Sequence, residues 1–225
     1  MEKSNLARSV ADINTLNDIV FNFIFGSEDR KAYTISFLNS VLENDLHSPI
    51  IDLSIIDRIH PEYLDEESPM GFDASCRLEN NKTVFVGVQI VNQQDAVNRM
   101  LFYWSLKYAR TLGFAESYSQ HKPVYMVPIL TFPLHKYSSP HTRSIICNNV
   151  DKKPETDRFA IHWIEVPKLD VHQDLSQKSQ LDRWVAFFAN QKMSESERDK
   201  LMIDMTINQA YSEIDRFFAG DDSSP

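Results

Sequence analysis

The sequence predicts an α/β protein, with a central mixed β-sheet flanked by helices and with further helices at the C-terminal end. Two observations support this fold class. The spacing of apolar residues is helical over residues 17–47, alternates over 70–91 and becomes helical again over 94–112. Shorter apolar runs then lead to two helical patterns that close the chain. The length of 225 residues, with 42% hydrophobic and 24% charged residues, suits one globular domain.

Two helices are expected before the first strand. Asn17 is a suitable N-cap for a short apolar helix that ends at Gly26, a residue type that tolerates the left-handed conformation. Apolar residues at helical spacing from Ile35 to Leu42 predict a second helix, which should stop near residues 44–47.

The next segment is predicted to form strands. Residues 50–59 are rich in Ile and Leu, and residues 70–79 and 83–91 alternate between apolar and polar. Asn80 and Asn81 stand between the two alternating runs, and asparagine tolerates the positive φ of a tight turn. We therefore expect a β-hairpin.

A long helix over residues 94–112 should lie across this sheet and stop at Gly113. Its sheet-facing stripe is predicted to consist of Val97, Leu101, Trp104 and Tyr108. Residues 124–132 then form a nearly continuous apolar run, typical of a strand buried on both faces. Pro128 inside that run requires a bulge or an edge position.

The last third of the chain predicts two short strands and two helices. The strands are expected at 143–147 and 159–166, and the helices at 176–190 and 194–218. Ser194 with Glu197 three residues later forms a capping box for the second helix. We divide the chain into an N-terminal extension (1–15), a core (16–170), a C-terminal helical segment (171–219) and a flexible tail (220–225).

The net charge, the cysteines and the N-terminal residues limit which classes of function are expected. The formal net charge of −9 disfavours long non-specific tracking along phosphate backbones, although it permits a local basic cleft. Cys76 and Cys147 lack C-x-x-C spacing, so free thiols are expected and a zinc site is not. No run approaches the ~20 apolar residues of a membrane span, and residues 1–14 lack the apolar segment expected of a signal peptide. We expect a cytoplasmic protein without a membrane partner.

The hairpin carries the candidate chemistry. Asp73 stands in a strand pattern, where aspartate is depleted, and a period of two puts it on one face with Ser75. A three-residue turn would place Asp73 opposite Gln89 and Ser75 opposite Gly87. A two-residue turn would instead place Asp73 opposite Val88 and separate the polar groups, because a slip of one residue exchanges the faces.

Carboxylates on adjacent strands are the arrangement that a hydrolytic magnesium site requires. Mg²⁺ takes hard oxygen ligands and keeps several waters, so two carboxylates and a scissile phosphate can fill its sphere. Asp73 supplies the first carboxylate. At the place for the second the sequence has Gly87.

An ordered set of segments resembles the recombination-promoting nuclease and transposase branch of the PD-(D/E)XK nuclease superfamily. The resemblance covers roughly residues 16–170. The matching segments are Asn17-Asp18-Ile19-Val20-Phe21, Phe25-Gly26, Phe37-Leu38-Asn39-Ser40-Val41-Leu42, Asp73, Val88-Gln89, Asn98-Arg99, Tyr103-Trp104, Tyr108, Leu112-Gly113, Tyr118 and Trp163-Ile164-Glu165-Val166-Pro167-Lys168.

The resemblance implies a restriction-endonuclease-like core and cleavage of double-stranded DNA that depends on Mg²⁺ or Mn²⁺. Asp73 would match the metal-binding aspartate, and Gln89 the position held by lysine elsewhere in the superfamily. Arg99 near the metal would stabilise developing phosphate charge. The acidic residue of the site should occupy position 87, where this sequence has glycine.

Gly87 leaves three alternatives open. The protein is a degenerate nuclease kept as a binding or regulatory module, or Gly87 is an engineered change, or a carboxylate from elsewhere replaces the missing one. The replacement candidates are Glu79, Asp95, Asp57 and Asp18. A further alternative is a non-catalytic interaction subunit, in which the acidic surface and the closing helices over 176–218 form a homodimer or bind a protein partner.

Overall fold

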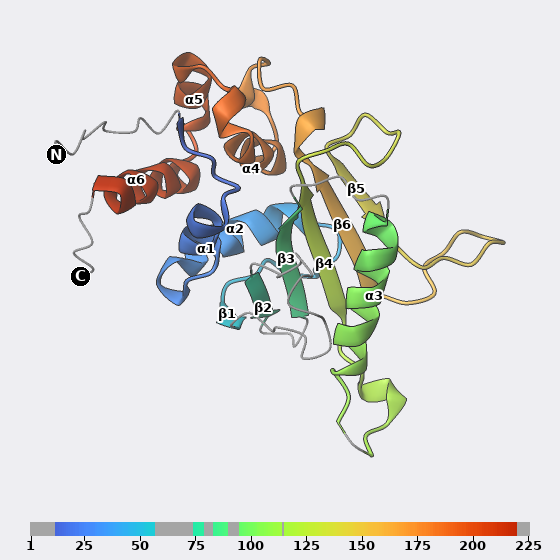
Figure 1. The fold of residues 1–225 in the computed structure, drawn as a ribbon. Helices are drawn as coiled ribbons and strands as arrows, with labels where there is room; N and C mark the ends of the chain where they lie inside the picture. The colour runs from blue at the N-terminus through green and yellow to red at the C-terminus, as the bar shows by residue number, and fades with distance from the viewer. Residues whose placement is uncertain (1–11, 57–73, 79–82, 90–94, 114, 220–225) are drawn as a thin grey trace.

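The computed structural model describes residues 12–56, 74–78, 83–89, 95–113 and 115–219. They form a six-stranded mixed sheet in the order β1-β2-β3-β4-β6-β5, with helices on both sides (Figure 1), which confirms the predicted fold class. The strands are β1 (Leu53–Ile56), β2 (Ala74–Leu78), β3 (Thr83–Gln89), β4 (Val124–Leu130), β5 (His141–Ser144) and β6 (Phe159–Glu165). The helices are α1 (Asp18–Phe25), α2 (Lys31–Val41), α3 (Ala96–Ala109), α4 (Gln180–Phe188), α5 (Glu195–Leu201) and α6 (Met205–Ala219).

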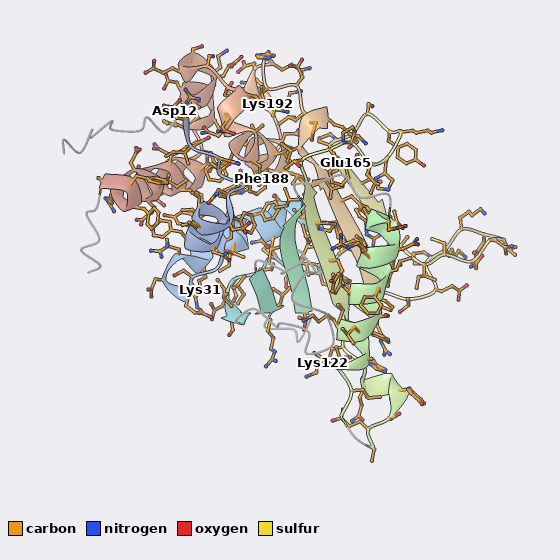
Figure 2. The ribbon with its side chains drawn as sticks, viewed as in Figure 1. Asp12, Lys31, Lys122, Glu165, Phe188 and Lys192 are labelled. Atoms are coloured by element: carbon orange, nitrogen blue, oxygen red, sulfur yellow. The ribbon has the colours of Figure 1, made fainter. Side chains whose placement is uncertain are left out.

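Two apolar clusters cover the two faces of the sheet. The larger one joins α1, α2, α4 and α6 to one face, and its centre is aromatic. The Phe25 ring lies 5.6 Å from Trp184 and 5.7 Å from Phe188, which Figure 2 labels in the interior of this layer. Such pairs stabilise by about 0.5–1.5 kcal/mol beyond their buried area. The smaller cluster lies under α3, which runs along β4 and β6 (Figure 1).

Helix α1 begins and ends where the sequence predicts. The reason for glycine at its C-terminal position, Gly26, differs from the one expected. The Asn17 side chain accepts a hydrogen bond from the amide of Ile19, as expected of an N-cap. Gly26 has φ −103° and is not left-handed. A Cβ at this position would lie 2.8 Å from the carbonyl oxygen of Asn22, so close approach to the preceding turn requires glycine here.

The predicted register of the hairpin is wrong by two residues. Ser75 lies opposite Phe85, where we expected Gly87, and Ala74 lies opposite Val86. The described pairs are centred on residue 80, because Arg77 pairs with Thr83, whereas the expected turn over 80–82 is centred on residue 81. A shift of two residues changes the pairs but not the faces of the described positions, and Asp73 itself lies outside the described residues.

The stripe predicted on α3 is rotated by one residue. Val97 and Leu101 are exposed, at 42% and 43%, and Trp104 and Tyr108 lie at the flank of the contact. The buried positions are Ala96, Met100, Tyr103 and Lys107. The Trp104 indole donates to the carbonyl of Val124 at 2.9 Å, so a hydrogen bond joins α3 to β4 at the edge of their contact.

Pro128 occupies the interior of β4 without a bulge and away from the sheet edge, contrary to expectation. Strand β4 pairs with β6 up to Met126↔Ile161 and again from Ile129↔Ile164, in one unchanged register. The interruption between these pairs surrounds Pro128, which has no N–H to donate. The partner on the other side is Gly87 of β3.

The predicted helix 194–218 is two helices, α5 and α6, while the predicted capping box of Ser194 and Glu197 is present. Asp204 separates them, because its Oδ1 accepts from the amides of Thr206 and Ile207 and so starts a new helix. Within the described part of the chain, no helix has the length and apolar character needed to cross a membrane.

Candidate functional site

The candidate site lies on β3, at the carboxyl end of three parallel strands. Gly87 is in register with Pro128 of β4, and Gln89 is in register with Leu130, which in turn pairs with Glu165 of β6. One row across the sheet therefore contains positions 89, 130 and 165. In open α/β sheets ligands bind preferentially at the carboxyl ends of the strands.

The aspartate that the sequence predicts as a metal ligand lies just before β2. Asp73 comes directly before Ala74, the first residue of β2, and lies outside the described residues, as do Glu79 and Asp57. Ala74 pairs with Val86, the neighbour of Gly87. The described register thus brings the start of β2 to the level of Gly87.

Helix α3 brings two further predicted residues towards this end of the sheet. Because the Trp104 indole is bonded to the first residue of β4, the preceding turns of α3 lead towards the carboxyl end of that strand. Asp95 is exposed at the start of the helix, and its carbonyl accepts from the amide of Arg99 at 2.8 Å. Asp18 starts α1, which packs against α2 and α6 in the cluster of the other face. Asp95 and Arg99 therefore belong to the helix on one face of the sheet, whereas Asp18 belongs to the helical layer on the other face.

Glu165 is the buried carboxylate at this end of the sheet. Its side chain is fully buried, and Oε2 accepts from the amides of Leu134 (2.5 Å) and His135 (3.1 Å) and lies 2.8 Å from Lys168 Nζ. Oε1 accepts from His135 Nδ1 at 2.9 Å. Figure 2 labels Glu165 at the upper end of the strands.

These contacts determine the charge state of Glu165. Burial raises the pKa of this carboxyl, but the hydrogen bonds from Lys168, Leu134 and His135 outweigh burial and hold the pKa below its usual value. Both oxygens of Glu165 are thus occupied by donors of the protein, as expected of a structural anion. The sequence signal for this group is a glutamate that ends an apolar strand, with a lysine three residues later.

Comparison with known families agrees with the resemblance read from the sequence. The model of a family described as PD-(D/E)XK nuclease family transposase matches residues 15–222. The chain belongs to this family. Comparisons with curated proteins and with solved structures find no match.

Nucleases of the PD-(D/E)XK family usually use divalent metal ions, and Mg²⁺ prefers carboxylate and other hard oxygen ligands. Position 87 lies within a described strand and has no side-chain donor. Within the described ranges, no group of three or more His, Cys, Asp or Glu side chains is arranged to hold a metal ion. The donors on the described part of the hairpin do not fit a magnesium site built on two carboxylates.

Lys107 lies two turns beyond Arg99 on α3 and is not part of a solvated helix face. It is 5% exposed, and burial, together with the neighbouring charge of Arg110, lowers its pKa to about 8. Arg99 is half-buried. Of these two cations on the helix, Arg99 is the one nearer the carboxyl end of the sheet.

Proposed function

We propose that this member of the PD-(D/E)XK nuclease family transposases acts on DNA with a degenerate metal site and is weak or inactive as a nuclease. The observation that carries the proposal is Gly87, in register with Pro128 inside the sheet, at the position where the family resemblance implies an acid. A glycine offers Mg²⁺ no side-chain oxygen, and one carboxylate with an amide binds this cation more weakly than two carboxylates.

The second candidate is an active endonuclease that uses Mg²⁺ or Mn²⁺ with a relocated carboxylate. Asp95 favours it among the described candidates, because this exposed residue starts the helix that follows β3 by six positions. In that case Asp73 and Asp95 would hold the metal, Gln89 would contact it, and Arg99 would stabilise the phosphate charge.

Restoration of the acid tests the proposal directly. Mg²⁺ and Mn²⁺ are titrated into the protein and into Gly87→Glu by calorimetry, and both proteins are incubated with supercoiled plasmid. We expect the native chain to bind the metal weakly and to cut little or no DNA, and Gly87→Glu to gain both metal binding and cleavage. Metal-dependent cutting by the native chain at rates equal to those of Gly87→Glu would contradict the proposal.

Two matched variants separate the candidates. If Gly87→Glu cuts, Asp73→Ala in that background should abolish cutting, because it removes the other metal carboxylate. Asp95→Asn in the same background should leave cutting unchanged. Cutting by the native chain that is lost in Asp95→Asn would instead support the relocated carboxylate.

An interaction subunit is distinguished by DNA binding. If the protein acts on DNA, double-stranded DNA should bind without metal, and its affinity should fall as salt rises, because phosphate contacts release counterions. Absence of binding at low salt, together with a stable dimer in solution, would favour a partner surface on residues 171–219. Trp184, Phe187, Ile207, Tyr211 and Ile214 of α4 and α6 face the core, whereas Ile203 before α6 and Met205 and Phe218 within it are exposed.

A further inference from the structure

Four aromatic rings form a nearly parallel column at the C-terminal end of α3. Trp104 and Tyr108 stack at 4.8 Å and 15°, and Tyr108 stacks on His121 at 4.3 Å and 18°. Tyr118 continues the series, 6.2 Å from His121 and tilted by 16°. The first three rings are half-buried, whereas Tyr118 is 82% exposed. The column therefore ends in a flat ring with an open face.

The segment that carries Tyr118 is held in place by hydrogen bonds. A 3₁₀ turn, η3 (Tyr118–Gln120), begins with a capping box between Ser117 and Gln120. The guanidinium of Arg158 donates to the carbonyls of Tyr118 and Ser119 at 3.3 and 3.0 Å. The Thr111 hydroxyl lies 2.9 Å from His121 Nδ1. A ring on such a scaffold loses little conformational freedom when it binds a ligand.

Three cationic residues adjoin the residues of the column. Arg110 follows Tyr108 by two residues, Lys122 follows His121, and Arg158 is bonded to the carbonyl of Tyr118. Figure 2 labels Lys122 at the lower end of the sheet, beside the end of α3. Two acids also adjoin these residues: Glu116, which accepts from the amide of Gly113 at 2.6 Å, and Asp157, which precedes Arg158. Three cations against two acids contrast with the net charge of −9 for the whole chain.

The column stands on the same side of the sheet as the candidate site. Val124 and Met126 belong to the cluster under α3, and by alternation Pro128 and its partner Gly87 share that face. The Trp104 indole is bonded to Val124, the first residue of β4, whereas Pro128 lies four residues further towards the carboxyl end of that strand. The column therefore lies at the amino end of the strands and the candidate site towards their carboxyl end.

We propose that the open face of Tyr118 is a stacking platform for an unpaired base of single-stranded DNA. An exposed, pre-oriented ring flanked by Arg and Lys is the combination that single-strand binding proteins use, because every base offers a π-face to the ring and a phosphate to the cations. A protein partner would instead insert an anchor side chain into a pocket. The ligand class rests on the proposed action on DNA, whereas the platform requires no metal and no cleavage.

The test is binding of a short single-stranded oligonucleotide that carries 2-aminopurine, measured in EDTA so that the metal site does not contribute. The fluorescence of 2-aminopurine should fall on binding, because stacking quenches it. Tyr118→Ala should weaken binding about 5- to 100-fold and remove the quench. Tyr118→Phe keeps the ring and should retain both.

Tyr137→Ala is the matched control, since Tyr137 is another exposed tyrosine, at 66%, outside the column. It should bind like the native protein, and Lys122→Ala should reduce the salt dependence without removing the quench. The proposal is overturned if Tyr118→Ala and Tyr137→Ala bind equally, if only duplex DNA binds, or if RNA of the same sequence binds more tightly. Because cleavage is not measured, failure here leaves the Gly87 experiment unaffected.

Discussion

At the scale of single residues, Glu165 and Gly87 differ in what they place near the carboxyl end of the sheet: one is a carboxylate and the other has no side chain. Glu165 is fully buried, and its two oxygens face Lys168, His135 and two backbone amides. A buried carboxylate with this many donors is stable as an anion, but removal of the charge leaves its partners unpaired. Gly87 has no side chain, so it needs no such donors and offers no ligand atom to a metal ion.

Replacement of Glu165 by glutamine should lower the free energy of unfolding by about 3 kcal/mol, because Lys168 would remain buried at 10% side-chain exposure without its counter-charge. Urea denaturation measures the effect. Glu213→Gln is the control, since Glu213 forms a more exposed pair with Arg216 on α6 and should cost less than about 0.5 kcal/mol. Equal effects of the two substitutions would show that Glu165 is not the structural anion inferred here.

At the scale of elements, the break between α5 and α6 depends on one side chain. Asp204 is 8% exposed at its side chain, caps α6 through the amides of Thr206 and Ile207, and pairs with Arg183 of α4 at 3.3 Å. Helix α6 then buries Ile207, Tyr211 and Ile214 against the larger core. The cap therefore sets the direction in which the last helix leaves α5.

Asp204→Ala should destabilise the protein by about 1–2 kcal/mol, because two amides at the start of α6 lose their acceptor. Asp204→Asn keeps an oxygen for the cap and loses the charge opposite Arg183, so it should cost less than half as much. Thermal or urea unfolding of the three proteins gives the comparison. If Asp204→Asn is as harmful as Asp204→Ala, the ion pair with Arg183 dominates and the cap is secondary.

At the scale of the whole molecule, a buried polar cluster joins the helical layer to the far edge of the sheet. Asp45, in the loop after α2, pairs with Arg143 of the edge strand β5, and its Oδ2 lies 3.3 Å from His162 Nε2 on β6. His162 is 1% exposed, and its Nδ1 lies 3.0 Å from His141 Nε2. Tyr125 packs beside them, with ring centroids 6.3 Å from His162.

The cluster predicts loss of stability in acid. Burial, with the nearby charges of His162 and Arg143, lowers the pKa of His141 from 6.5 to about 4. Between those values the unfolded chain binds a proton that the folded chain does not, so stability should fall as pH drops from about 6.5 towards 4. Burial raises the pKa of Asp45, but hydrogen bonds from His162 and Arg143 outweigh burial and lower it, which extends the loss below pH 3.8.

Urea denaturation at pH 7 and pH 5 should therefore give a smaller difference in unfolding free energy for His141→Gln than for the native protein. His172→Gln is the matched control. His172 is exposed, and its hydrogen bond to Glu197 raises its pKa, so its contribution is present at low pH and is lost as pH rises. Its removal should leave or enlarge the loss in acid. An unchanged pH dependence in His141→Gln would remove this cluster as the cause.

Local sequence patterns were sufficient to predict most helices and strands, but not how these elements pair and pack. The N-cap at Asn17, the capping box at Ser194 and the buried run of β4 follow from nearest neighbours and appear as predicted. The rotation of α3 depends on strands distant in the sequence, whereas the hairpin register and the break at Asp204 depend on turn and capping geometry that apolar periodicity does not record, so periodicity alone misplaced all three. Of the candidate site, Asp73 lies outside the described residues, and its role stays a prediction.

The sequence by itself determined the fold class, the family and the absence of an acid at position 87, because apolar period, motif order and residue identity are local properties. Only the tertiary structure decided that Gly87 meets Pro128, that Glu165 is already occupied by protein donors, and that Tyr118 extends the stack of Trp104 and Tyr108. The physical reason is that strand register, burial and ring stacking are set by chain segments that meet only when the protein folds.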